Sequence, residues 1–172
     1  MLKKYLIGLM LFPTLTMASD IDIKIELPTL NVAEYHNPYV AVWLQAPDKK
    51  IQNLSVWYQL ESRGQKSEKG EEWLKDMRQW WRAIGRSSDM PIDGVSGATR
   101  KPGVYELHFT QGQTPLDKLS KGEYVLMIEA AREVGGREVV KIPFSWPVKE
   151  KTELSAKGKK ELGEVRLSIG TN

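Results

Sequence analysis

Short apolar alternations separated by turn residues run through most of the chain and constrain its fold more than any other feature. The first of them places Ile21, Ile23, Ile25 and Leu27 at every second position and ends at Pro28. A period of two is that of a strand with one buried face. Six further strand-like segments follow, at 39–44, 54–58, 104–109, 124–131, 139–146 and 165–169. Seven strands with turn residues between them predict a mainly β chain, an immunoglobulin-like antiparallel β-sandwich.

Individual segments give the sandwich more detail. Residues 39–44 are apolar at every position, which is typical of a central strand buried on both faces. Pro47–Lys50 predicts the turn into the next strand, where we expect Leu54, Val56 and Tyr58 on one face and Trp57 on the other. Gly135–Gly136 predicts the turn of the hairpin between the fifth and sixth strands.

The segment 71–84 departs from the strand pattern. Its apolar residues recur at helical spacing, at Trp73, Met77, Trp80 and Ile84, with Leu74 and Trp81 alongside. Acidic residues at its start and Arg82 near its end suit a helix dipole, and Gly85 is a candidate cap. The sequence therefore predicts one amphipathic helix, about residues 71–84, inserted into the sandwich.

The first 18 residues have the layout of a secretory signal peptide. Lys3 and Lys4 precede an apolar run over 5–15, and small residues then predict cleavage after Ala18. The alternative is an uncleaved membrane anchor, which Pro13 and the shortness of the run disfavour. We expect an exported, periplasmic protein that is soluble after cleavage, with residues 19–172 forming a single β-sandwich domain.

Charge and cysteine content exclude several classes of function. Residues 1–18 hold two of the 25 basic residues and none of the 22 acidic ones, so 25 − 2 = 23 bases face 22 acids in the mature chain. The bases are interspersed with acids, which argues against nucleic-acid binding. With no cysteine there is no disulfide, thiolate zinc site, iron–sulfur cluster or covalent c-type haem. Redox chemistry would need an organic cofactor.

Asp93–Thr99, with the sequence Asp-Gly-Val-Ser-Gly-Ala-Thr, holds the candidate site. Three small residues, Ser96, Gly97 and Ala98, precede the hydroxyl of Thr99 and would leave it accessible, with Gly97 free to take unusual backbone angles. Asp93 is suited to accept backbone hydrogen bonds in the turn. Arg100 and Lys101 follow, and such cations pair with phosphate. A plain turn-rich loop leading through Pro102–Gly103 into a strand is the alternative.

The same residues resemble the acceptor signature of bacterial flavin transferases, which reads Asp, two variable residues, Ser or Thr, Gly, Ala, then Thr or Ser. Every fixed position is filled in 93–99. The resemblance implies that a transferase cleaves FAD and leaves FMN on the Thr99 hydroxyl through a phosphodiester. Arg100 and Trp81 are additional candidates for contact with the flavin.

Other candidate residues have ordinary structural interpretations. Trp80 and Trp81 could stack on a flavin ring, but a tryptophan stripe of this spacing is more often core. Residues 94–98 fall one position short of the Gly-x-Ser-x-Gly elbow, and a sandwich lacks its strand–turn–helix context, which disfavours a Ser96 nucleophile. We expect His36 to order the Tyr35–Tyr39 turn rather than to bind metal. We interpret the alternating charges of 129–133 as an ion pair between neighbouring strands.

Four segments, 35–43, 73–75, 93–99 and 129–138, resemble the family of predicted periplasmic proteins that carry domain of unknown function 2271. The resemblance covers nearly the whole mature chain. It implies an extracytoplasmic electron-transfer setting, with a periplasmic flavin transferase and a PepSY-type membrane redox protein as partners. We therefore predict a flavinylated electron carrier rather than an enzyme in its own right, and no metal. The alternative is a cofactor-free immunoglobulin-like binding or assembly module.

Overall fold

The computed structural model describes residues 20–60 and 70–170. The predicted signal peptide, residues 1–18 with cleavage after Ala18, lies outside the described residues. The elements in chain order are β1 (Asp20–Leu27), β2 (Tyr39–Gln45), β3 (Ile51–Tyr58), the 3₁₀ helix η1 (Gly70–Asp76), α1 (Arg78–Ala83), the 3₁₀ helix η2 (Gly85–Ser87), β4 (Ser96–Ala98), β5 (Gly103–Thr110), β6 (Gly122–Ala131), β7 (Arg137–Trp146), β8 (Thr152–Lys157) and β9 (Glu164–Gly170). In this part of the chain, no helix is long and apolar enough to span a bilayer.

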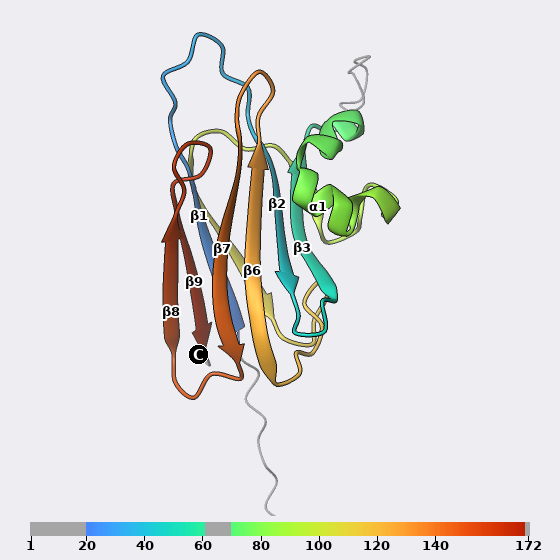
Figure 1. Ribbon diagram of the computed structural model, residues 1–172, viewed down its shortest axis with the longest axis vertical. Helices are drawn as coiled ribbons and strands as arrows, with labels where there is room; N and C mark the ends of the chain where they lie inside the picture. Colours follow the sequence, from blue (N-terminus) through green and yellow to red (C-terminus); the bar gives the residue numbers. More distant parts are fainter. Residues whose placement is uncertain (1–19, 61–69, 171–172) are drawn as a thin grey trace, which may run out of the picture.

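The strands form two sheets (Figure 1). One has four strands in the order β5-β1-β9-β8, and the other has five in the order β4-β3-β2-β6-β7. Neighbouring strands are antiparallel except β3 and β4, which are parallel. The prediction of a mainly β chain is confirmed, and the immunoglobulin-like class stays a prediction. All seven predicted strands are present, whereas β4 and β8 were missed.

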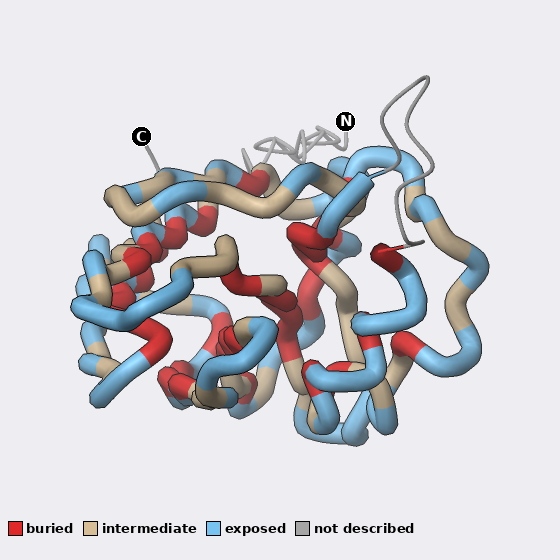
Figure 2. The backbone as a smooth tube through the Cα atoms, turned by 90° about the horizontal axis from the view of Figure 1, so that it is seen from above, coloured by how far each residue is buried: buried red, intermediate tan, exposed pale blue. Residues whose placement is uncertain are grey.

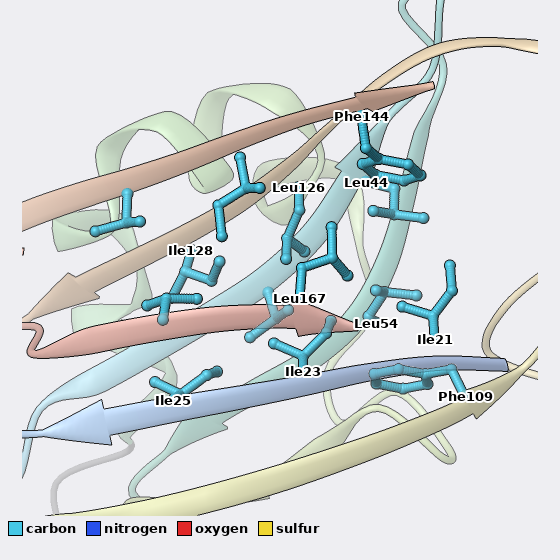
Figure 3. Close-up of a cluster of buried hydrophobic side chains, with 14 of the residues drawn as sticks. Ile21, Ile23, Ile25, Leu44, Leu54, Phe109, Leu126, Ile128, Phe144 and Leu167 are labelled. Carbon is cyan, nitrogen blue, oxygen red and sulfur yellow. The ribbon is translucent and has the colours of Figure 1, made fainter. Parts of the chain in front are cut away.

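An apolar core lies between the two sheets. The alternating residues of β1 point into it, and Ile21, Ile23 and Ile25 have no exposed surface. Residues of the other sheet, among them Leu44, Leu126 and Ile128, meet them from the opposite side (Figure 3). Buried residues gather inside the molecule and exposed ones along its connections (Figure 2). The alternation read from the sequence thus gives the buried face of β1.

A second apolar cluster covers the outer face of the five-stranded sheet. Leu74, Met77 and Trp80 from the helical segment are at most 1% exposed and pack on residues of β2, β3 and β6 (Figure 1, green). Because β2 has the core on one face and this cluster on the other, all of its apolar residues are buried or nearly so. The prediction of a central, two-sided strand at 39–44 is confirmed.

The single helix predicted over 71–84 is wrong, because the segment is divided at Met77. Its backbone angles, φ −76° and ψ 72°, are not helical, and they separate η1 from α1. A carboxylate outside the segment, that of Glu129, accepts hydrogen bonds from the amides of Gln79 and Trp80 and so begins a new helix. Gly85 is not a left-handed cap. A Cβ there would lie 2.5 Å from the Trp80 ring, so glycine is needed for close packing.

A bulge changes the expected faces of β3. The register with β2 shifts between Val42 and Trp43, which leaves Leu54 as an extra residue in β3. Leu54 and Trp57 therefore both face the core between the sheets, whereas Val56 belongs to the outer cluster. The prediction that Leu54 shares a face with Val56 is wrong, since strict alternation does not survive a bulge.

The predicted turns are confirmed. The Ala46 amide bonds to the Lys50 carbonyl at 2.8 Å across the β2–β3 turn, where Lys49 has a φ of 66°. In the β6–β7 hairpin the Arg132 amide bonds to the Gly136 carbonyl at 3.0 Å, and Val134 takes the positive φ, 51°.

Candidate functional site

The segment 93–99 is a turn followed by an edge strand. The Ser96 amide donates to the Ile92 carbonyl at 2.9 Å, and the Ile92 amide donates to Ser96 Oγ at 2.9 Å. Gly94 has a φ of 68°, so the left-handed residue of this turn is Gly94 and not Gly97. Val95 is buried in the outer cluster, and its carbonyl accepts the Val56 amide at 2.9 Å. The turn is thus fastened to β3 at its far end.

The expected open loop is wrong for Ser96–Ala98, which form β4 and pair with Val56–Tyr58 of β3. Ser96 and Gly97 are half-buried, and Ala98 is exposed. A backbone that follows an edge strand keeps its hydrogen bonds on one side and leaves the other side open. The sequence missed this strand because three small residues carry no apolar alternation.

Asp93 does not hold the turn. It is exposed, and its carboxylate makes no hydrogen bond with the residues that the structure describes. The role predicted for the Asp93 carboxylate belongs to the Ser96 hydroxyl, which accepts a hydrogen bond from the Ile92 amide. This segment continues as a strand and not as the helix of a hydrolase elbow. Both observations argue against a Ser96 nucleophile.

Thr99 lies directly after β4, at a pocket of about 320 Å³. Its amide donates to the Tyr58 carbonyl at 3.1 Å, and the residue is half-buried. The lining comes from five parts of the chain, and we call this cavity the Thr99 pocket; its residues are His36, Asn37, Tyr39, Gln59, Trp73, Asp76, Thr99 and Glu133. The predicted acceptor hydroxyl therefore belongs to a residue that borders a cavity with aromatic, amide and carboxylate groups.

Two aromatic residues line this pocket. Trp73, on η1, is 39% exposed, one of the few large apolar side chains on the described surface. Tyr39, the first residue of β2, is half-buried, and burial raises the pKa of its phenol although a hydrogen bond with the Gln59 backbone lowers it. Both rings are thus held by elements that also carry buried core residues.

The pocket is also acidic. Asp76 and Glu133 line it, and both add to the raised pKa of Tyr39. His36 lies between two carboxylates, with Nε2 at 3.1 Å from Glu34 and Nδ1 at 3.6 Å from Glu133. His36 thus joins its own loop to the β6–β7 turn. Within the described ranges, no cluster of His, Asp and Glu has the arrangement to hold a metal ion.

Arg100 stacks on two aromatic rings. Its guanidinium carbon lies 3.9 Å from the centroid of the Trp57 ring and 4.9 Å from that of Tyr105. Burial lowers the pKa of this guanidinium, while Tyr105 raises it. The Arg100 charge already has partners in the fold, whereas Lys101 is exposed. Of the two cations proposed for a phosphate, Lys101 is the less engaged.

The tryptophans predicted near the flavin have different surroundings. Trp80 is fully buried and donates from Nε1 to Asn53 Oδ1 at 3.0 Å, which confirms its interpretation as core. Trp81 is half-buried, packs against the outer cluster and does not line the Thr99 pocket. Trp73 lines that pocket instead. The helical spacing assigned Trp73 to the apolar face of one helix, because the break at Met77 leaves no mark in the local pattern.

Charged groups on β6 and directly after it pair with neighbouring elements. Glu129 has no exposed surface and pairs with Arg137 Nη1 at 2.7 Å, which confirms the predicted ion pair between neighbouring strands for this residue. For Arg132 and Glu133 the prediction is wrong, because both follow the end of β6 and pair with residues of connections. Arg132 pairs with Glu161 at 2.9 Å, with both side chains at most 6% exposed, and so ties the hairpin to the β8–β9 connection. Buried pairs of this kind are costly to break and hold their elements in one register.

The family model described as predicted periplasmic protein (DUF2271) matches residues 20–164. The chain belongs to this family. No curated protein matches it. Two solved structures of human GIVD cytosolic phospholipase A2, in complex with methyl gamma-linolenyl fluorophosphonate, are similar at 11% and 9% identity with TM-scores of 0.34. The matches cover 91% of this chain but 18% of the phospholipase chain. At this TM-score they support no conclusion about the fold or the function of this chain.

Proposed function

We propose that this periplasmic family member is an electron-transfer protein that carries FMN covalently on the Thr99 hydroxyl. In the attachment step a periplasmic flavin transferase breaks the pyrophosphate bond of FAD, and AMP leaves. The FMN phosphorus forms a bond to Thr99 Oγ, whose proton is released. The observation that carries the proposal is the position of Thr99, which ends a complete acceptor signature and borders a cavity lined by aromatic residues.

The residues present fit such a group. The cavity, at about 320 Å³, is within the size range of ligand pockets, which begins near 300 Å³. Trp73 and Tyr39 offer ring surface, and Asn37 and Gln59 offer amide groups to a heterocycle. Lys101 is the exposed cation next to the acceptor. A bound flavin would supply reversible uptake of one or two electrons, and the chain would hold it at the end of β4.

The compartment is part of the proposal. We propose cleavage of residues 1–18 after Ala18, with 19–172 as a single domain exported to the periplasm. There the flavin transferase is the partner that loads the protein, and a membrane protein of the PepSY type is a candidate partner for electrons. The description of the family as predicted periplasmic protein supports this compartment.

A cofactor-free binding module is the second candidate, and one observation favours it. β4 is an edge strand with Ala98 exposed, and an open edge can accept a strand of a partner protein. Under this alternative the Thr99 hydroxyl carries no modification. The two functions therefore differ in a covalent mass.

The test is the intact mass of the protein coexpressed with an active flavin transferase and exported to the periplasm. We expect a gain equal to FMN less one water in the wild-type protein and in Thr99→Ser, which keeps a hydroxyl, and no gain in Thr99→Val. Thr152→Val changes a threonine at the start of β8, outside the signature, and should load normally. An unmodified wild-type protein would refute the proposal, and flavin retained by Thr99→Val would refute Thr99 as acceptor.

A further inference from the structure

We infer that the Thr99 pocket is the seat of the isoalloxazine ring, with the Trp73 indole as its stacking partner. The inference rests on the proposed function and adds the place and surroundings of the ring. A flavin tethered at Thr99 has its ring at the end of a ribityl chain, so the ring settles near the attachment point. The cavity that Thr99 itself lines offers aromatic surface at the attachment point, from Trp73 and Tyr39.

Trp73 is positioned for contact rather than for packing in the core. Its neighbour Leu74 is 1% exposed and anchors η1 in the outer cluster, while Trp73 keeps 39% of its surface in solvent. Lys75 Nζ lies 5.7 Å from the centroid of the Trp73 ring. An indole on a well-anchored turn loses little conformational freedom when a planar ligand stacks on it.

The charged residues of the pocket favour different positions for the isoalloxazine ring and for the phosphodiester of the bound FMN. Asp76 and Glu133 make the cavity acidic, which disfavours the phosphodiester deeper in the cavity and favours it at the border, where Thr99 holds it and Lys101 is exposed nearby in the chain. The neutral oxidised ring suffers no such repulsion. One-electron or two-electron reduction can place a negative charge on the ring, and two nearby carboxylates disfavour that charge. The pocket therefore favours the oxidised flavin over the reduced one, and it lowers the reduction potential of the bound flavin relative to a flavin without nearby carboxylates.

Flavin fluorescence tests the stacking directly, because an indole in contact with the ring quenches its emission. We expect weak emission from the flavinylated wild-type protein and a several-fold increase in Trp73→Leu at equal flavin content, established by intact mass. Trp81→Leu is the matched control, since Trp81 is half-buried on the same helical segment but does not line the pocket, and its emission should equal that of the wild-type protein. Far-UV circular dichroism verifies that both variants fold.

The reduction potential tests the electrostatic part. The double variant Asp76→Asn, Glu133→Gln keeps the shape of both side chains and removes both charges, so its midpoint potential should be higher than that of the wild-type protein. Glu123→Gln, an exposed carboxylate on β6 outside the pocket, should leave the potential unchanged.

The outcomes separate this inference from the function on which it rests. A flavinylated wild-type protein with equal emission in Trp73→Leu would overturn the stacking assignment, and an unchanged or lower potential in the double variant would overturn the acidic surroundings. In both cases covalent loading at Thr99 would stand. A wild-type protein that takes up no FMN would remove the proposed function and this inference together.

Discussion

Replacing Glu129 should have a larger effect on stability than any other carboxylate change on β6. Its side chain is fully buried, accepts the Gln79 amide at 3.0 and 3.1 Å and the Trp80 amide at 2.7 Å, and pairs with Arg137 at 2.7 Å. Glu129→Ala leaves two amides at the start of α1 without a partner and removes one half of a buried ion pair. Nothing else described can satisfy those amides, because they begin a helix.

The magnitude follows from these contacts. Hydrogen bonds to a charged group contribute about 1.5–3 kcal/mol each, and removing one partner of a buried pair costs about 3–5 kcal/mol in total. Arg137 is 35% exposed, so water can solvate the arginine that Glu129→Ala leaves behind, which favours the lower part of that range. We expect a loss of about 3–4 kcal/mol in the free energy of unfolding. At roughly 2–4 °C per kcal/mol for a chain of this size, Tm should fall by about 6–16 °C. Glu129→Gln keeps an acceptor oxygen and should lose about half as much.

Urea unfolding followed by tryptophan fluorescence measures this loss, because Trp80 is fully buried above Glu129. The matched control is Glu123→Ala, an exposed carboxylate on the same strand that accepts from Ser145, for which we expect a change within about 0.5 kcal/mol. A loss in Glu129→Ala below about 1 kcal/mol would show that the carboxylate does not hold α1 to the sheet.

Arg100→Ala should lower the free energy of unfolding by about 1–2 kcal/mol through loss of its stacking on Trp57, with a changed near-UV circular dichroism, whereas Lys101→Ala should change neither; equal effects would contradict the stacking role. Burial raises the pKa of Glu138, but the amides of 159–162 outweigh it and hold that pKa below 4.5, so its contribution is complete above pH 4.5 and is lost as pH falls through the folded-state value. Urea midpoints measured down to about pH 3 should therefore fall less steeply in Glu138→Gln than in the wild-type protein, and identical slopes would refute this assignment.

Strands with a regular apolar pattern could be predicted from the sequence, and those without one could not. β1 has every second residue buried, and β2 has apolar residues throughout, so composition and period determine both. In β8 no residue is fully buried, and β4 has three small residues, so neither strand carries a strong apolar alternation. Such strands depend on backbone pairing with a neighbour, which their side chains do not record, whereas the other two edge strands, β5 and β7, have a pattern regular enough to be predicted.

Helical spacing over 71–84 correctly predicted a buried apolar face, but it wrongly predicted one continuous helix. The periodicity reports that Leu74, Met77 and Trp80 share a buried face, which they do. It does not report the break at Met77, since the cause of the break is a carboxylate 49 and 50 residues away that bonds to the amides of Trp80 and Gln79. Tertiary hydrogen bonds of this range are invisible to a local pattern.

The signature around Thr99 could be recognised from the sequence, whereas the cavity that Thr99 borders could not. The signature is contiguous, because all of its positions lie within residues 93–99. The cavity brings together ends of strands and turns that are distant in the chain, such as Tyr39 at the start of β2, Gln59 after β3 and Glu133 after β6. No spacing links these positions. Trp73 was therefore assigned to the core, and adjacency in sequence favoured Trp81.

The hairpin of β6 and β7 is what makes the signature and the cavity one site. Glu129 of β6 holds α1 by its first amides, and η1, which directly precedes α1, carries Trp73 and Asp76. Four residues after Glu129, Glu133 enters the same pocket and pairs with His36. One strand thus sets one helical wall and one acidic group of the cavity, while β3 sets Thr99 through its amide bond to the Tyr58 carbonyl. Glu129 does not itself line the cavity, but a change at Glu129 should alter the emission of a flavin on Thr99, because it displaces η1, which carries Trp73.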